Sequence, residues 1–319
     1  MSEASRPNSE SLVRVAGRDA IEAAARRLRA GDLVALPTET VYGLAARADR
    51  AEAVAEIYRA KGRPSFNPLI VHVLDIETAA RLAVFDDRAQ ALAQRFWPGA
   101  LTLVLPLKPD AGLAPAVTAG LKTVALRCPA HPVMRAILAE ADLPLAAPSA
   151  NRSGAISPSR AEHVLSSLGI RAGMILDAGP CPEGIESTII ALREGSGWQV
   201  LRPGPKSADE IAEVLGEAPH EGRLASIEAP GQLASHYAPA KAVRLEADKA
   251  LPDEFHIGFG AVAGDASLSR KGDAAEAAAR LYALLHEADA SAKPRIAVAP
   301  IPDDGMGIAI NDRLRRAAS

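Results

Sequence analysis

Three consecutive side chains with hydroxyl or carboxyl groups follow an apolar run near the start of the chain. The run at residues 33–36 ends at Pro37, and Thr38, Glu39 and Thr40 come next. Polar groups are costly to bury without partners, so a cluster of them at a strand end is well placed to contact a ligand. We therefore expect a ligand site at this point of the chain.

Two cations flank Gly62 one helix later. Lys61 and Arg63 lie where a helix has to stop before Pro64. Lysine acts as a mobile point charge and arginine as a planar fork for two phosphate oxygens, so the pair favours an anionic ligand. The alternative is that both cations only complement the C-terminus of a helix, a contribution of about 0.3–1 kcal/mol.

Eight short motifs follow one another in a fixed order after residue 12. They are residues 37–44 (PTETVYGL), 61–69 (KGRPSFNPL), 96–102 (FWPGALT), 147–151 (APSAN), 186–188 (EST), 201–204 (LRPG), 230–239 (PGQLASHYAP) and 305–314 (GMGIAINDRL). This order resembles the two-domain threonylcarbamoyl-AMP synthases, in which a YrdC-type domain precedes a C-terminal extension domain. The resemblance covers nearly all of the chain after residue 12.

The resemblance implies a nucleotidyltransferase that converts L-threonine, bicarbonate or CO2, and ATP into threonylcarbamoyl-AMP and pyrophosphate. In that family the amine becomes a carbamate, whose oxygen attacks the α-phosphorus, and other proteins transfer the group to the adenosine next to the tRNA anticodon. Mg²⁺ is expected with ATP as the cofactor. Positioning and electrostatics can support such a reaction without a protein nucleophile.

Site residues are assigned by their positions in the resembled motifs. The catalytic pair implied is Lys61 and Arg63. The ATP contacts implied are Lys61, Arg63, Asn67, Ser149, Asn151, Ser157, Arg202 and Tyr237. The threonine contacts implied are Thr38, His72, Thr123, Arg127, Ser187 and Thr188. No residue is assigned to a metal.

Several of these residues have a structural alternative. A loop of Ser, Asn, Gly and Pro, such as the one around Ser149 and Asn151, is also what an ordinary turn looks like. His72 lies in an apolar strand and would more often be a satisfied core histidine. Trp97 could stack on a base, but with aromatic residues at 3% a structural anchor is the better interpretation.

The C-terminal half contains a proline-bounded segment and a group of basic residues near its end. Residues 230–239, called the lid segment below, hold His236 and Tyr237 between restricting prolines. The resemblance implies that this segment reaches over the ATP site, with Tyr237 against the nucleotide. The alternative is that Tyr237 only packs between the domains, which would affect stability and not nucleotide affinity. The basic residues Arg313, Arg315 and Arg316 look like an RNA hook but are better explained as charges at a helix C-terminus.

Helical and extended patterns alternate over most of the chain. Helices are expected at residues 19–31, 51–61, 88–96, 132–141 and 159–168. Strands are expected at residues 33–36, 69–74, 101–107, 124–127, 143–147, 174–176, 188–192 and 199–201. We predict an α/β fold with an open, twisted, mixed sheet of the YrdC type at residues 12–206.

A smaller βαβ-like domain is expected after a connecting segment. Residues 207–241 are assigned to a helix and an interdomain linker, because prolines and glycines interrupt the pattern there. Residues 242–319 are assigned to the second domain. Its expected elements are strands at 242–245, 256–260 and 296–300, a helix at 273–288 and a basic terminal helix.

Composition sets limits on function. The 319 residues have a net charge of −3, which supplies no general attraction for polyanions. The first 206 residues carry 24 basic and 21 acidic side chains, and the others carry 12 and 18. Cys128 and Cys181 are too few for a disulfide framework, and residues 1–10 are polar without an apolar signal region. We expect a cytoplasmic protein with a short disordered tail and no membrane contact.

Two rival functions remain. A non-catalytic RNA-binding module would use a basic concave face and bind RNA with a steep salt dependence. The modest charge of the first domain and the lack of interleaved aromatic and basic residues argue against it, so we expect no stable nucleic-acid contact. The carbamoyltransferase that matures hydrogenases also resembles this domain, but its cysteine-rich zinc segments are missing here.

Overall fold

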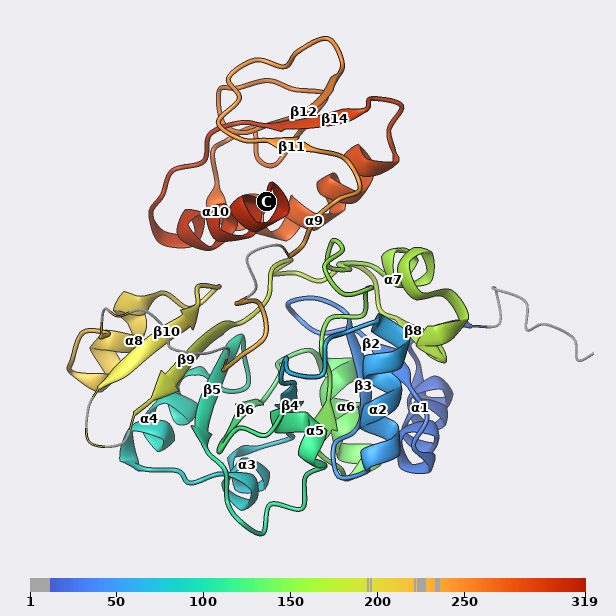
Figure 1. The fold of residues 1–319 in the computed structure, drawn as a ribbon, viewed down its shortest axis with the longest axis vertical. Helices are drawn as coiled ribbons and strands as arrows, with labels where there is room; N and C mark the ends of the chain where they lie inside the picture. The colour runs from blue at the N-terminus through green and yellow to red at the C-terminus, as the bar shows by residue number, and fades with distance from the viewer. Residues whose placement is uncertain (1–11, 194, 196, 221, 223–227, 233–235) are drawn as a thin grey trace, which may run out of the picture.

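The structure is a computed structural model that describes residues 12–193, 195, 197–220, 222, 228–232 and 236–319. The expected tail at residues 1–10 and parts of the expected linker, including residues 233–235 of the lid segment, lie outside the described residues. Figure 1 shows a larger body built on one sheet and a smaller body that holds the C-terminus.

The larger body is organised around a mixed sheet of ten described strands, so the expected open mixed α/β sheet is confirmed. The order across the sheet is β1-β8-β2-β3-β7-β4-β6-β5-β9-β10. The strands are β1 (Val13–Val15), β2 (Val34–Leu36), β3 (Gly43–Arg47), β4 (Ile70–His72), β5 (Leu101–Pro106), β6 (Thr123–Arg127), β7 (Leu145–Ala146), β8 (Met174–Asp177), β9 (Thr188–Leu192) and β10 (Trp198–Arg202).

Helices cover the two faces of this sheet unequally. They are α1 (Arg18–Ala30), α2 (Ala51–Lys61), α3 (Ile76–Leu82), α4 (Asp87–Phe96), α5 (Pro115–Thr118), α6 (Pro132–Ala141), α7 (Ala161–Leu168), the 3-10 turn η2 (Gly169–Ala172) and α8 (Ala208–Leu215). On one face, Leu28 of α1 and Ile137 of α6 pack against Leu36. On the opposite face, Ile57 of α2 and Leu92 of α4 belong to the main core.

Half of the α1 and α6 face has a different cover. This half is formed by β4, β6, β5, β9 and β10. Ile70 of β4, Ala125 of β6, Val104 of β5 and Leu201 of β10 face it, and the described residue that packs on them from outside the sheet is Ala229. No residue of a described helix belongs to this cluster. We call this region the helix-free half. Because no described helix covers it, polar side chains from different strands can lie close together there.

The smaller body has a parallel sheet in the order β11-β14-β12-β13, which confirms the predicted second, smaller α/β unit. Its elements are β11 (Val243–Arg244), β12 (Glu254–Gly258), β13 (Ala266–Ser267), α9 (Ala274–Ala290), β14 (Arg295–Val298) and α10 (Gly305–Ala317). Its core also contains Tyr237 of the lid segment and Val41, Ile156 and Ile185 of the larger body. The two bodies therefore share one apolar interface.

Sequence patterns missed some elements and assigned others correctly. β3, within the sequence GLAAR, reads as a loop followed by helix formers and becomes a strand because it pairs with both β2 and β7. The helix predicted in the segment 207–241 is α8, and its Ile211 packs in the main core of the larger body. Trp97 is a buried anchor as expected, because its Nε1 donates to the Leu101 carbonyl at 2.7 Å.

Candidate functional site

Strand alternation aims His72 and Arg127 at the helix-free half. Val71 in β4 and Leu126 in β6 pack in the main core, so the next residue of each strand faces the other way. His72 and Arg127 are direct partners in the parallel ladder between these strands. The two side chains therefore stand side by side on the uncovered face.

A β-bulge brings Arg202 to the same face. The register between β10 and β9 shifts between Val200 and Arg202, so Arg202 pairs with Ile189, a residue of the helix-free half. A bulge adds one residue to one strand and re-aims the side chain that follows. Arg202 then donates to the Ser187 carbonyl at 3.0 Å and to the Ser187 Oγ at 3.1 Å, and burial lowers its pKa.

A turn closed by hydroxyl groups carries the first polar motif. Thr38 Oγ1 donates to the Val41 carbonyl at 2.6 Å and accepts from the amides of Thr40 and Val41 at 3.2 Å. Arg127 donates to Thr40 Oγ1 at 2.9 Å and to Glu39 Oε1 at 2.6 Å. Burial by itself would raise the pKa of Glu39, but the charge and hydrogen bond of Arg127 outweigh it and hold the pKa at about 2.

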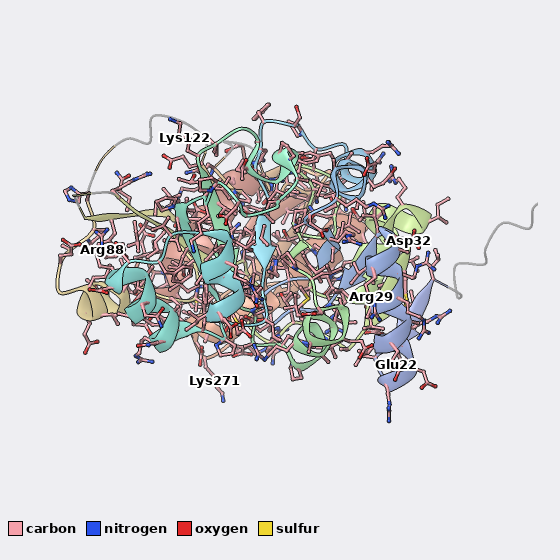
Figure 2. The ribbon with its side chains drawn as sticks, turned by 90° about the horizontal axis from the view of Figure 1, so that it is seen from below. Glu22, Arg29, Asp32, Arg88, Lys122 and Lys271 are labelled. Carbon is pink, nitrogen blue, oxygen red and sulfur yellow. The ribbon has the colours of Figure 1, made fainter. Side chains whose placement is uncertain are left out.

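Lys61 is buried, whereas Lys122 and Lys271 extend from the surface in Figure 2. Its Nζ donates to the carbonyl oxygens of Ser149 and Asn151, both at 2.5 Å. Burial, and after it the charge of a neighbouring guanidinium, lowers the pKa of Lys61 well below its usual range. The side chain thus bonds to the loop after β7 rather than to the end of its own helix.

Arg63 lies against the same region. It is 8% exposed and donates to the carbonyl oxygens of Asn67 and Pro68 at 3.2 and 2.8 Å. Burial, with a smaller contribution from the charge of Arg202, lowers its pKa to about 10. Lys61, Arg63 and Arg202 therefore concentrate like charges in a buried space, a cost that an anionic ligand would offset.

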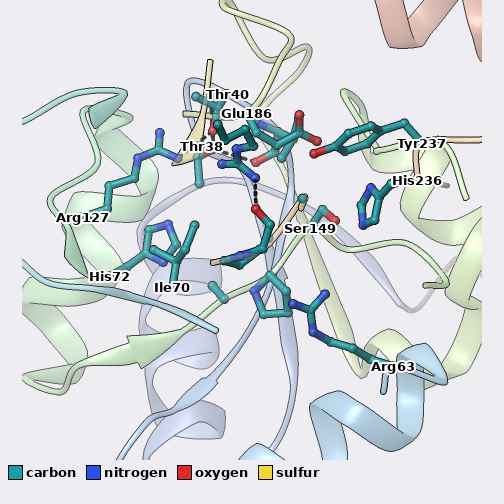
Figure 3. A pocket seen from close by; sticks show the side chains of 17 residues that line it. Thr38, Thr40, Arg63, Ile70, His72, Arg127, Ser149, Glu186, His236 and Tyr237 are labelled. Carbon is teal, nitrogen blue, oxygen red and sulfur yellow. Dashed lines mark hydrogen bonds between the residues drawn. The ribbon is translucent and has the colours of Figure 1, made fainter. Parts of the chain in front are cut away.

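The lid segment closes a small cavity between these groups. Figure 3 shows Arg127 and His72 on one side of it and His236 and Tyr237 on the opposite side. Its volume is about 40 Å³. Ligand pockets commonly measure about 300–1,000 Å³, so the cavity in this structure is much smaller than a typical ligand pocket.

Two backbone features fit the lid segment into this space. Gly231 has a φ of +88°, and a Cβ there would lie 2.7 Å from Tyr237 Oη and 2.9 Å from Arg202 Cδ, so no larger residue fits without a shift. Tyr237 itself has a φ of 63°, in the left-handed region that L-residues seldom adopt. Its ring packs 5.8 Å from the ring of Tyr282, between centroids, and 5.4 Å from the Arg313 guanidinium carbon.

Buried polar atoms without a partner collect at this site. Among the described residues eight such side-chain atoms occur, and five of them belong to residues assigned above to ligand contacts or to His236 of the lid segment. These five are Asn67 Oδ1, His72 Nδ1, Asn151 Oδ1, His236 Nδ1 and Tyr237 Oη. An unpaired buried polar atom costs about 1–3 kcal/mol, so native structures pair nearly all of them with protein, water or ligand.

Two of the predicted threonine contacts lie away from the cavity. Thr123 begins β6 and Arg127 ends it, which separates them by about 13 Å at roughly 3.3 Å per residue. Thr188 alternates with Ile189 and so faces the main core, where its Oγ1 donates to the Lys206 carbonyl at 2.7 Å. The structure therefore brings Thr38, His72 and Arg127 together but not these two residues.

The cavity wall includes a carboxylate that the sequence assignment left out. Glu186 lines the cavity, and its Oε1 accepts from Ser157 Oγ at 2.6 Å. The signal was available, because Glu186 precedes two hydroxyl residues at the start of β9. Burial would raise the pKa of Glu186, but the charges of Arg313 and Arg202 hold it at about 2. Ser157 is thus linked to the cavity by its hydrogen bond to Glu186, and Ser187 is linked to it by its hydrogen bond from Arg202.

The interpretation of Arg313 as a charge at a helix C-terminus was wrong. Its side chain is fully buried, and Nε donates to Glu186 Oε2 at 2.9 Å. An RNA hook is excluded for the same reason, because a buried guanidinium cannot contact a polyanion. Arg315 and Arg316 do lie in the last turn of α10, as expected.

Comparison with known proteins relates this geometry to a family. Residues 26–204 match the family model of Sua5, YciO and YrdC proteins, described as telomere recombination, and residues 207–319 match the threonylcarbamoyl-AMP synthase C-terminal domain. A threonylcarbamoyl-AMP synthase of Bacillus subtilis is 42% identical over 322 residues, which cover 93% of this chain and 92% of that protein. The chain belongs to the threonylcarbamoyl-AMP synthase family.

Other members of the family match in fold and in length. The crystal structure of P. abyssi Sua5 complexed with L-threonine has a TM-score of 0.87 at 35% identity, covering 96% of this chain and 97% of that chain. A relative from Mycobacterium tuberculosis is 43% identical over 197 residues, which cover 61% of this chain and 89% of its own.

The described part of this family member has neither a cluster of metal-ligand side chains nor a membrane-spanning helix. No group of three or more His, Cys, Asp or Glu side chains there could hold a metal ion. No helix in that part of the chain is long and apolar enough to cross a membrane. Cys128 and Cys181 are both buried and free.

Three histidines of this family member are expected to make its stability depend on pH. Burial is the main cause that lowers the pKa of His72, His163 and His236 to about 3, against about 6.5 in an unfolded chain. As pH falls below 6.5, the unfolded chain binds protons that the folded chain does not, so stability falls by up to about 1.4 kcal/mol per pH unit for each histidine. The carboxyls of Glu39 and Glu186, with a pKa of about 2, lose their contribution only below about pH 4.5.

Urea unfolding between about pH 8 and pH 5 measures this dependence. His163→Gln removes one of the three contributions and should make the slope shallower. A slope that is flat in the unmodified protein, or unchanged in the variant, contradicts the prediction.

Proposed function

We propose that the chain joins L-threonine, bicarbonate or CO2, and ATP into threonylcarbamoyl-AMP and pyrophosphate by nucleotidyl transfer. The threonine amine becomes a carbamate, and a carbamate oxygen attacks the α-phosphorus while pyrophosphate leaves. Both reacting partners are anionic, so the main task of the site is to hold them together and offset their charge. The product supplies the threonylcarbamoyl group for the adenosine next to the tRNA anticodon.

One observation carries this proposal: the unpartnered buried polar atoms of His72, His236 and Tyr237 line one cavity together with the buried guanidinium groups of Arg63 and Arg202. Neutral polar atoms without partners and buried cations without a hydrogen-bonded carboxylate, such as Arg63 and Arg202, are both costly in isolation. A ligand with phosphates at one end and an amino acid at the other would satisfy both kinds of group. A merely structural role for the motifs gives no reason for five such atoms to belong to the predicted site residues.

The two ends of the site differ in charge. We assign the phosphates of ATP to Lys61, Arg63 and Arg202, with Asn151 as a neutral contact, because these cations have only carbonyl and hydroxyl acceptors among the described residues. Threonine is assigned to the opposite end, where His72 presents an unpartnered Nδ1. Burial keeps His72 neutral, so its ring can exchange hydrogen bonds with the substrate without adding charge.

The threonine end also gives a basis for selectivity. Thr38 and Thr40 present hydroxyl groups, and Arg127 contributes a positive charge toward the substrate carboxylate. Valine has the shape of threonine but lacks its hydroxyl, so it would leave buried polar groups of this pocket unpaired. We therefore expect the site to discriminate against valine by hydrogen bonding and not by volume.

Cofactor and partner assignments follow from the same reaction. We expect Mg²⁺ to enter as part of the MgATP substrate, because the carboxylate at the cavity, Glu186, already accepts hydrogen bonds on both oxygens. Downstream partners are the proteins that transfer the threonylcarbamoyl group to tRNA. A cytoplasmic location agrees with two free cysteines.

Pyrophosphate release from ATP tests the proposed function. With threonine and bicarbonate present, release should be fast, and omitting either one should reduce it to background. Release that does not depend on threonine, or no release under any condition, contradicts the proposal. Replacing threonine by valine should reduce the rate by at least about a hundredfold, since the pocket would be left with unpaired groups.

A further inference from the structure

The smaller body reaches the cavity through one carboxylate of the larger body. Glu186 Oε2 accepts from Tyr282 Oη at 2.8 Å and from Arg313 Nε at 2.9 Å. Tyr282 belongs to α9 and Arg313 to α10. With Ser157 Oγ on Oε1, three donors from two bodies hold this carboxylate in the cavity wall.

Arg313 contacts both this wall and the lid segment. Its guanidinium is fully buried, and Nη1 donates to Asp312 Oδ2 at 2.7 Å. Its guanidinium carbon lies 5.4 Å from the centre of the Tyr237 ring, a distance typical of a cation–π contact. One side chain of the smaller body therefore touches a cavity-lining carboxylate and a cavity-lining ring at once.

Resting on the proposed function, we propose that Tyr282 and Arg313 are positioning residues for the reaction. They hold the Glu186 carboxylate in one orientation, and Glu186 in turn holds Ser157 Oγ and balances the charge of Arg202. When the lid segment closes, Arg313 also provides the surface on which the Tyr237 ring rests. The smaller body thus completes the reaction centre from outside the domain that carries the catalytic residues.

The physical basis is the cost of a misplaced buried charge. A buried carboxylate that loses a partner is strongly destabilised and either reorients or takes up a proton. Either change would move Ser157 and alter the field at Arg202, and displacements of about 1 Å in a reaction centre can cost about a hundredfold in rate. Among the described residues, the titratable or charged groups that face Glu186 are Arg313, Tyr282, Arg202, His236 and Tyr237, and Asp312 accepts from Arg313.

Tyr282→Phe is the mildest test, because it removes one O–H donor and keeps the ring in the core. We expect kcat/KM for ATP to fall by at least about tenfold and the melting temperature to fall only modestly, because Arg313 and Ser157 still donate to the carboxylate. The matched control is His163→Phe, which alters another contact between the bodies, the His163–His286 ring stack at 3.9 Å, without touching Glu186. The control should keep kcat/KM within about twofold of the unmodified protein.

Arg313→Met tests the positioning role through pH. Without the guanidinium, burial should raise the pKa of Glu186, so kcat/KM for ATP should show an additional fall on the acid side. The double variant Arg313→Met/Glu186→Gln should lack that additional fall, since glutamine does not titrate. A lower melting temperature with an unchanged pH profile, or Tyr282→Phe activity equal to that of the control, would overturn the proposal.

A binding measurement separates this proposal from the proposed function. Titration with a non-hydrolysable ATP analogue needs no turnover, so it remains informative if no pyrophosphate is released. Tyr282→Phe should weaken binding of the analogue by at least about tenfold relative to His163→Phe. Equal binding by the two variants counts against positioning, whatever the reaction proves to be.

Discussion

Replacing Arg63 or Lys61 by alanine is expected to lower kcat/KM for ATP by about 2–4 kcal/mol of transition-state stabilisation, roughly 30-fold to 1,000-fold. Each side chain is buried and forms no ion pair with a carboxylate among the described residues, so its positive charge can be used on the phosphates. Lys61→Ala should also lower the melting temperature, because the carbonyl oxygens of Ser149 and Asn151 lose their common donor. Steady-state kinetics and a melting curve on the same variants separate the two effects.

The chain offers a matched control for these variants. Arg59 lies in the same last turn of α2, but it is exposed and forms an ion pair with Glu56. If the cations only complement the helix C-terminus, Arg59→Ala should cost about as much as the other two. A change of less than about threefold for both Lys61→Ala and Arg63→Ala, about 0.7 kcal/mol, would assign those residues to the helix end.

Tyr237→Phe is expected to raise KM for ATP by about tenfold to a hundredfold without destabilising the protein. The variant removes a hydroxyl that is buried and has no described partner. If the nucleotide is that partner, its loss costs about 1.5–3 kcal/mol, the usual range for a hydrogen bond to a charged group. Because an unpaired hydroxyl is costly in the ligand-free protein, the melting temperature without ATP should stay the same or rise.

Tyr237→Ala gives the contrasting result. The ring is 1% exposed and belongs to the core of the smaller body, so its removal should lower the melting temperature by creating a cavity. It should also increase ATP breakdown that yields no product, because an open lid admits water to reactive intermediates. Unchanged ATP affinity in Tyr237→Phe would assign the residue to packing between the bodies alone.

The sequence predicted the alternation of strands and helices because those elements carry their own signals. Leu33 to Leu36, the helix before Gly62 and the buried Trp97 were all readable from local pattern, and the structure has them nearly in place. The resemblance of the eight ordered motifs to a known family also predicted which loops lie close together in the fold. These are properties of short segments, so the sequence contains them directly.

Properties of the assembled sheet were not readable in the same way. Thr123 and Thr188 have suitable hydroxyls, but strand position and alternation place them away from the cavity. Arg202 reaches the cavity because a bulge shifts the register by one residue, which no local pattern shows. Arg313 looked like an exposed charge because its partner, Glu186, is distant in sequence and belongs to the other body.

Tyr237 belongs both to an apolar core and to the wall of the cavity. From the sequence, Tyr237 was expected either to cover the nucleotide or to pack between domains, with different effects on stability. The structure places its ring in the core of the smaller body and its hydroxyl at the cavity, so both descriptions apply. A side chain with an apolar body and a polar tip can serve both roles at once.

The left-handed backbone of Tyr237 has a consequence for the reaction cycle. A non-glycine residue in this conformation costs about 1–2 kcal/mol, so the closed lid segment is a strained state. Bound nucleotide can offset that strain through contacts with Tyr237 Oη and His236 Nδ1. If the lid role proposed for this segment holds, those contacts are lost when pyrophosphate and the adenylate leave, and we expect relaxation of this backbone angle to favour opening. We therefore expect closure to be self-limiting, because the residue that covers the site also favours its opening after turnover.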